Sequence, residues 1–393
     1  MRVERDMAGI ALFFMAGTAS GMLLLPDIAS SPEVLSHART AASAASLLQI
    51  PAGIAVLLHT SRLTSAAGKE AIITSGRNNS LIYITLTLLM FYLSGLSGAL
   101  ASAISSDIVI RECSGAAASA DRLIERCSRH FRDAIDAVPY GDPGCNALAK
   151  ALLSGDKSSV TTEIKEAFRA SGASHILALS GMHLGVIYAI LLKATAFAGN
   201  SPGAKKIRSV IIVVISGGYT LVTGASASLV RAMLFITINE AARIAGRQPS
   251  PMNTFFASAL IQLTVEPGSI RSAGFQLSYL AVAGIHLLYP SMRQWYPGNG
   301  KGDILKKIWN SAALSIACQI FTGPAAWIIF GTFPKYFLIT NLLAVPLSTF
   351  LMVLSAAATI LYPAGLCPEL LLRACSKSAE MLSLTLDLIA GLP

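Results

Sequence analysis

The stretch Ser174–Lys193, SHILALSGMHLGVIYAILLK, is long and apolar enough to cross a lipid bilayer as one helix, since about 20 residues span the hydrocarbon. Its first half nevertheless carries His175, Ser180 and His183. Polar side chains inside a span usually face the interior of a helix bundle or a water-filled route. Ser180 and His183 share one helix face. That face is expected either to line a polar pathway or to hydrogen-bond a neighbouring helix for stability alone.

Two glycines of the same stretch, Gly181 and Gly185, have the GxxxG spacing that lets a second helix backbone approach closely. They predict a tight helix contact. His175 and His183 lie about 80° from a common face at the helical period, and the stretch contains no cysteine or carboxylate. We therefore expect no metal site here.

The whole chain has the composition of a membrane protein. Of its 393 residues, 53% are hydrophobic and 13% are charged, whereas a soluble domain carries about 25% charged residues. Its mean hydropathy is +0.61. The net charge of +9 is weak evidence for a nucleic-acid partner, because most positive residues fall in loops on one side of the predicted topology.

The apolar runs predict an all-α fold, a polytopic membrane helix bundle with about 11 transmembrane helices. The Lys and Arg residues of alternate loops place the N-terminus in the cytoplasm and the chain in the plasma (inner) membrane as a multi-pass protein. The spans are expected at residues 7–25, 41–59, 81–104, 174–198, 208–223, 225–244, 252–266, 274–290, 308–331, 336–361 and 370–391.

These spans divide the chain into an N-terminal membrane segment (1–104), a long external loop (105–173) and a membrane core (174–393). Apolar residues recur in the loop at helical spacing from Leu123 to Val138, and shorter helices are expected at about 146–154 and 158–171. These helices either lie flat on the membrane or form a small cap packed on the bundle.

Three of the six cysteines, Cys113, Cys127 and Cys145, lie in this external loop. An oxidising compartment would allow one disulfide among them. The alternative is three free or buried thiols.

Further polar residues interrupt the membrane core. Arg231 lies one or two turns inside a span, either in a pathway or reaching back to the surface. Gln276 and Ser278 lie near the outer end of another span, just after Arg271. Late spans are interrupted by Pro324, Asn341 and Pro346, which either line a cavity or form simple kinks.

No soluble catalytic module is visible in the sequence. It has no phosphate-binding Walker loop, no dinucleotide fingerprint and no HxHxD cluster, and its six histidines are scattered. We therefore expect a channel or transporter without an enzyme activity, a cofactor or a catalytic residue.

Several stretches, taken in order, resemble the ComEC-type competence family, the inner-membrane channel for DNA uptake. The first is ALLSGDKSSVTTEIKEAFRASGASHILALSGMHLGVI at 151–187, followed by GASASLVRAML at 224–234 and GFQLSYLAVAGI at 274–285. The last is FPKYFLITNLLAVPL at 333–347. The resemblance covers roughly residues 145–360, and the run of motifs in order is specific.

The resemblance implies that the chain passes single-stranded DNA across the inner membrane in natural transformation. Phosphates would follow Arg231 and Arg271, while Ser180, His183 and Gln276 would line the route, with Tyr188, Tyr219 and Tyr279 as candidate stacking surfaces. The implied partners are DNA and membrane lipid, with a separate nuclease, a DNA receptor, a cytoplasmic helicase and an oligomeric state left open.

The sequence also departs from the family. The loop 105–173 is too short and too helical for the external OB-like domain of fuller members, and no metallo-β-lactamase-like domain follows the core. The chain is therefore expected to represent the competence core alone. The alternatives are a small-molecule permease on the same scaffold and a non-transporting membrane subunit.

Overall fold

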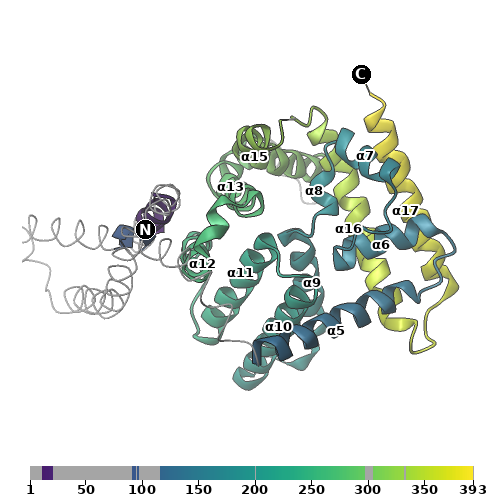
Figure 1. Cartoon of the computed structure of the whole chain (residues 1–393), viewed down its shortest axis with the longest axis horizontal. Coiled ribbons are helices and arrows are strands. Elements are labelled where there is room, and N and C mark those ends of the chain that lie inside the picture. Colours follow the sequence, from purple (N-terminus) through teal and green to yellow (C-terminus); the bar gives the residue numbers. More distant parts are fainter. Residues whose placement is uncertain are drawn as a thin grey trace, which may run out of the picture. The chain divides into compact units, whose positions relative to one another are not determined.

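The computed structural model describes residues 11–20, 91–93, 95–96, 116–199, 201–296, 304–331 and 333–392, and all regular elements in these ranges are helices (Figure 1). The chain divides into two compact units. One comprises Met1–Ala117 and Pro249–Ser272, and the other Ala118–Gln248 and Ala273–Pro393. Most of the predicted N-terminal spans 7–25, 41–59 and 81–104 lie outside the described residues, apart from a helix at Ala11–Ser20. The first unit also contains α12 (Pro251–Val265) and the short helix η2 (Pro267–Arg271).

The described part of the long loop is helical, as its spacing predicts. It forms α5 (Ala116–Asp136), α6 (Pro143–Ser154) and α7 (Thr162–Ala170). The start of α6 is fixed by Asp142, whose carboxylate accepts hydrogen bonds of 3.1 Å from the N–H groups of Gly144 and Cys145. Gly155 ends this helix in the left-handed conformation (φ 77°) that glycine tolerates best.

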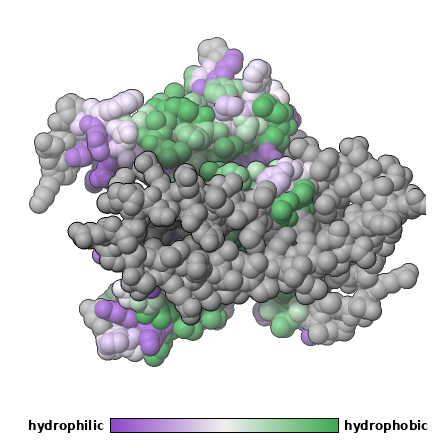
Figure 2. Space-filling model, turned by 90° about the vertical axis from the view of Figure 1, so that its left-hand side faces the viewer, coloured by the Kyte–Doolittle hydropathy of each residue, from purple (hydrophilic) through white to green (hydrophobic). Residues whose placement is uncertain are grey.

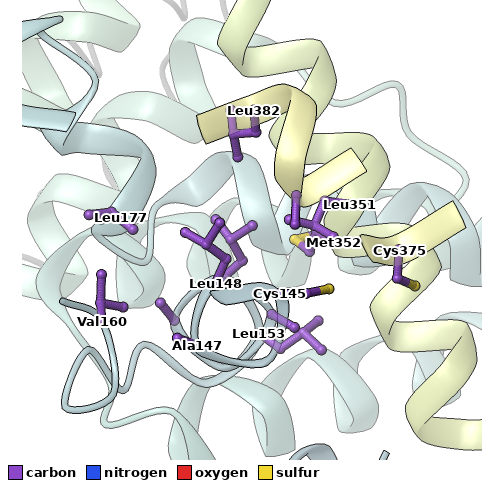
Figure 3. Packing of buried hydrophobic residues seen from close by; sticks show 14 of the residues in the cluster. Cys145, Ala147, Leu148, Leu153, Val160, Leu177, Leu351, Met352, Cys375 and Leu382 are labelled. Atoms are coloured by element: carbon purple, nitrogen blue, oxygen red, sulfur yellow. The ribbon is translucent and has the colours of Figure 1, made fainter. Parts of the chain in front are cut away.

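The α6 helix is packed into the largest hydrophobic core of the described residues. It lies against α16 (Phe337–Leu361) and α17 (Glu369–Ala390), where Leu148, Leu351 and Leu382 are fully buried (Figure 3). This packing favours the cap on the bundle over helices that lie flat on a membrane, because the apolar face of α6 is already covered by protein.

The two described cysteines of this region, Cys127 and Cys145, are free thiols. Cys127 is exposed, whereas Cys145 is buried near Cys375 of α17 (Figure 3). Burial raises the pKa of the Cys145 thiol to about 12. The predicted disulfide is therefore not formed between Cys127 and Cys145, and Cys113 lies outside the described residues.

The stretch Ser174–Lys193 is not one helix, so the predicted single span over 174–198 is wrong. It forms a four-residue helix, α8 (Ser174–Leu177), and a separate helix, α9 (Gly181–Ala194). Between them Ala178 is extended and Ser180 caps α9. The 14 residues of α9 measure about 21 Å at 1.5 Å per residue, which is shorter than the hydrocarbon of a bilayer.

Helix α9 packs with α10 (Pro202–Val222) and α11 (Ala227–Ile244). Their shared core contains Leu184, Ile212 and Leu229, one from each helix. The start of α10 precedes the predicted boundary at 208, because the Ser201 hydroxyl accepts a hydrogen bond from the Ala204 N–H and Pro202 takes the first helical position.

The remaining helices of the second unit are α13 (Ala273–Leu287), α14 (Tyr289–Gln294), α15 (Ile304–Phe330), α16 and α17. Within the described residues, α15 and α16 are the two helices long and apolar enough to cross a membrane. The side chains of Trp327 and Ile328 on α15 are 64% and 83% exposed. Figure 2 shows hydrophobic surface in the upper part of the view, at the same height at which Figure 1 draws α13 and α15. The predicted bundle of about 11 spans is not confirmed and stays a prediction.

Candidate functional site

The start of α9 is held by a reciprocal pair of side chains. The Ser180 hydroxyl accepts a 3.3 Å hydrogen bond from the Met182 N–H, and the Ser180 N–H donates to His183 Nδ1 over 3.2 Å. The Ser180 Oγ also lies 3.0 Å from the same nitrogen. This is a capping box, in which two otherwise unpaired backbone donors are satisfied. Ser180 is half-buried and His183 is 1% exposed. The primary role of both side chains is therefore to stabilise the start of α9.

Arg231 of α11 lies directly beside this helix start. A Cβ on Gly181 would be 2.9 Å from Arg231 Nη2 and 3.3 Å from the Cβ of Ala232, so α9 and α11 approach closely at this glycine and a larger residue would displace the guanidinium. The first N–H groups of a helix carry partial positive charge. The N-terminal start of α9 and the Arg231 guanidinium therefore form one electropositive region, which is suited to an anion.

The other contacts of Arg231 connect α11 to α13. Its Nε donates a 2.6 Å hydrogen bond to Ser278 Oγ. The guanidinium carbon lies 5.6 Å from the ring centre of Phe235 and 5.8 Å from that of Tyr279, within the range of cation–π attraction. Among the described residues no carboxylate lies within 4.0 Å of Arg231. The half-buried charge is held by a hydroxyl and two rings, so it is not cancelled.

Three helices thus bring predicted site residues together at one end. Ser180, Gly181 and His183 begin α9, Arg231 lies in the second turn of α11, and Ser278 lies in the second turn of α13. The Ser228 hydroxyl also donates to the carbonyl of Gly274 over 3.2 Å, which holds the starts of α11 and α13 against each other. We call Ser180, His183, Arg231 and Ser278 the α9–α11–α13 cluster.

The other predicted residues are not seen in this cluster. His175 is exposed on α8, where its Nδ1 lies 3.2 Å from the carbonyl of Gly172. Gln276 is half-buried on α13, and Asn341 lies on α16 with a buried Oδ1 that has no hydrogen-bond partner. Arg271 ends η2 in the first unit. An added Cβ on Gly185 would meet nothing within 4 Å, so the close contact is at Gly181 and not at Gly185.

Within the cluster, Ser180 contacts His183 and Arg231 contacts Ser278, and none of the four residues lines a cavity that is found in the described part of the chain. That cavity, of about 180 Å³, lies between α7 and α17 and is lined by Glu163, Phe168 and Asp387, among others. No three His, Cys, Asp or Glu side chains in the described ranges are grouped to hold a metal ion.

The family of the chain follows from a match that contains the whole cluster. The sequence model of the family described as Competence protein matches residues 152–393. The chain belongs to the Competence protein family. All four residues of the α9–α11–α13 cluster lie inside the match, whereas α5 precedes it.

Two relatives extend this result. The chain is 28% identical over 229 residues to "Uncharacterized protein YcaI" of Escherichia coli (strain K12), covering 56% of this chain and 30% of that protein. It is 26% identical over 219 residues to "ComE operon protein 3" of Bacillus subtilis (strain 168), covering 56% of this chain and 27% of that protein. The matched part is thus less than a third of each relative. No solved structure matches the chain.

The Competence region also contains a buried carboxylate, with a cluster of three donors around it, that the sequence analysis missed. Glu240 of α11 is 1% exposed. Its Oε1 accepts from the Tyr188 hydroxyl over 2.6 Å and from Arg243 Nη1 over 2.9 Å, and its Oε2 accepts from Ser209 Oγ over 2.6 Å. The carboxylate therefore connects α9, α10 and α11. A carboxylate inside a predicted span was the signal that could have identified this cluster.

Proposed function

We propose that the chain is the membrane core of a DNA-uptake channel, which passes single-stranded DNA across the inner membrane in natural transformation. Membership of the Competence protein family and the likeness to ComE operon protein 3 support a role in competence. In this proposal the chain acts as a multi-pass channel and has no nuclease or ATPase activity of its own.

The observation that carries the proposal is the charge on Arg231. A guanidinium without a carboxylate within 4.0 Å in the described structure, beside the start of a helix, attracts an anion but is indifferent to base identity. A translocated strand presents one phosphate per nucleotide and every base in turn. Such a strand requires a contact of this kind. His183 and Ser180 act as positioning residues in this proposal, because they fix the helix start against which Arg231 lies.

The test is DNA uptake by a deletion strain that is complemented with variants of the chain. Labelled DNA bound at the cell surface and labelled DNA that has entered the cell are scored separately. We expect Arg231→Ala to abolish entry while surface binding and membrane abundance stay normal. Arg231→Lys should retain part of the entry, because it keeps the charge but loses the planar fork of donors.

The matched control is Arg373→Ala on α17, which removes a solvent-exposed ion pair with Glu369 and should leave uptake unchanged. Normal entry in Arg231→Ala cells would contradict the pathway assignment. Normal entry in the deletion strain itself would instead support the alternative of a small-molecule permease.

A further inference from the structure

Positively charged residues gather at the end of the α9–α10–α11 group that lies opposite Arg231. In residues 174–248 the chain has seven Lys and Arg side chains but a single carboxylate, that of Glu240. The Ser209 hydroxyl near the start of α10 donates to Glu240 near the end of α11, so these two helices run in opposite directions. Six of the seven cations lie at this end, in the last turn of α9, in the first two turns of α10, and in the last turn of α11 or just after it. We call these six residues the α10 basic end: Lys193, Lys205, Lys206, Arg208, Arg243 and Arg247.

The single carboxylate of this region neutralises at most one of the six charges. Glu240 is buried and is paired with Arg243 at 2.9 Å, and the hydroxyls of Ser209 and Tyr188 also donate to it. Within the described residues, none of the other five cations has a carboxylate within 4.0 Å. The basic end therefore keeps a net positive charge.

Arg208 is the member of the basic end whose donors are left over inside the protein. Its side chain is half-buried, and its Nε is buried without a hydrogen-bond partner in the described part of the chain. A buried donor is normally satisfied by protein, by water or by a ligand. A guanidinium matches the oxygens of a phosphate with its planar fork of donors. Arg208 is therefore the residue around which a phosphate site would form.

The outward face of α10 is apolar. Ser209, Ile212, Ser216 and Thr220 are buried on one side of the helix. The exposed hydrophobic side chains lie on the other side, within about 140° of arc and over about 21 Å of helix. They are Ile207, Val210, Ile211, Val214, Ile215 and Leu221, and we call them the α10 apolar stripe. Figure 1 draws α10 at the lower edge of the second unit.

Arg208 lies at the edge of this stripe. At 100° per residue, Arg208, Ile211 and Ile215 fall within about 60° of arc, so they form one row along the helix. Lys205 precedes Arg208 by one turn on the same side. A cationic head is thus followed by an apolar surface, and the surface is longer than the roughly 15 Å of hydrocarbon in one leaflet of a bilayer.

The combination of a basic end and an apolar stripe identifies the partner as an anionic phospholipid. A nucleic acid offers phosphates but has no group that would cover the stripe. A second copy of the chain in the same membrane orientation would bring two basic ends together in a symmetric contact, and like charges would repel. A phospholipid offers a phosphate joined to long apolar chains, and basic pockets between membrane helices bind such head groups.

We propose that the start of α10 is a binding site for an anionic phospholipid, with its phosphate on Arg208 and Lys205 and its acyl chains along the α10 apolar stripe. This inference requires that the chain lies in a membrane and is independent of the passage of DNA.

The test uses the full chain, purified in an uncharged maltoside detergent. The dissociation constant of fluorescent phosphatidylglycerol is measured by anisotropy, with equally labelled phosphatidylcholine as the neutral reference. Each cation near a membrane surface changes the affinity for an anionic lipid about fivefold. We therefore expect wild-type chain to prefer phosphatidylglycerol at least tenfold. Arg208→Gln should weaken the binding of phosphatidylglycerol about tenfold, because the charge and the fork of donors are both lost. Arg208→Lys should lie between the two.

The matched control is Arg373→Gln on α17, which removes an exposed cation that lies beside Glu369 and should leave the preference unchanged. If Arg208→Gln does not fold, the double variant Lys205→Gln, Lys206→Gln replaces it. Both of these lysines are exposed, and the double variant should also lose about fivefold for each charge that contacts the lipid.

Three results would overturn the inference. The first is equal affinity of the wild type for the two lipids. The second is an unchanged preference in Arg208→Gln or, where that variant does not fold, in the double lysine variant. The third is displacement of the labelled lipid by inorganic phosphate or oligothymidylate as readily as by unlabelled phosphatidylglycerol, because the basic end would then be a site for a soluble phosphate.

Discussion

Arg231 and Glu240 are two ionisable residues of α11 with opposite surroundings. They are nine residues apart, about 13 Å along the helix. The Glu240 carboxylate accepts three hydrogen bonds and is paired with Arg243. The Arg231 guanidinium instead donates to one hydroxyl, that of Ser278, and lies near two aromatic rings. A satisfied buried charge holds helices together, whereas a charge without a counter-ion is available for a ligand.

Asp156 gives a residue-scale prediction of pH dependence. The hydrogen bonds that it accepts from Ser158, through the side chain and the backbone N–H (2.9 Å), hold its pKa below the usual value. Its contribution to stability is therefore present above the unfolded pKa of about 3.9 and is lost as the pH falls through the lower folded pKa. Asp156→Asn should lower the melting temperature at pH 7, and the difference should disappear well below pH 4. A difference that is the same at pH 7 and pH 3 would contradict this account.

At the scale of elements, the sequence predicted the long apolar helices well. Helix α16 was expected at 336–361 and is observed at Phe337–Leu361, and α17 was expected at 370–391 and is observed at Glu369–Ala390. Long apolar runs leave the backbone no alternative to helical hydrogen bonding. The break before α9 was missed because a local cap at Ser180 overrides hydropathy, and because His183 stands where the usual capping-box pattern has Glu or Gln.

The contacts within the site were harder to predict than the helices. Arg231 and Ser278 were both chosen from the sequence, but their direct hydrogen bond depends on how α11 and α13 pack. Gly181 and Gly185 have the same spacing signal, yet only Gly181 meets another helix. Spacing along one helix cannot say which of two positions faces a neighbour, because that depends on side chains of the other helix.

Glu240 gives a prediction about the α9–α10–α11 group. Glu240→Ala would leave the Tyr188 hydroxyl, the Ser209 hydroxyl and Arg243 without their common acceptor. The loss should be roughly 3 kcal/mol of stability, measured as a fall in melting temperature of the purified protein. Tyr188→Phe removes only one of the three donors and should cost roughly 1 kcal/mol. Equal melting temperatures for Glu240→Ala and the wild type would show that the cluster does not hold the helices.

Gly284 gives a second prediction at this scale. It is buried where α13 crosses α15, and a Cβ there would overlap the carbonyl oxygen of Ala317. Gly284→Ala should therefore push the two helices apart and lower the melting temperature. Gly218 on α10 has nothing within 4 Å of an added Cβ, so Gly218→Ala is the matched control and should be neutral or stabilising, by up to about 1 kcal/mol. Equal destabilisation by both substitutions would contradict the close crossing of α13 and α15.

At the scale of the molecule, composition predicts a membrane protein, and two features support it. Helices α15 and α16 are long and apolar enough to span a bilayer, and the chain belongs to the Competence protein family. The number of spans and their orientation stay predictions. The distribution of Lys and Arg among the loops predicts how a chain is oriented in a membrane. Helix packing alone does not depend on this orientation.

The most direct measurement of the central claim is strand entry into liposomes that contain only this chain. Purified protein is reconstituted, fluorescent single-stranded DNA is added outside with and without an imposed proton gradient, and the DNA protected from an added nuclease is counted. We predict that wild-type liposomes protect labelled strand and that Arg231→Ala liposomes protect no more than empty ones. Equal protection by the wild type and Arg231→Ala, or none by the wild type, would contradict the assignment of Arg231 to a DNA pathway in this chain.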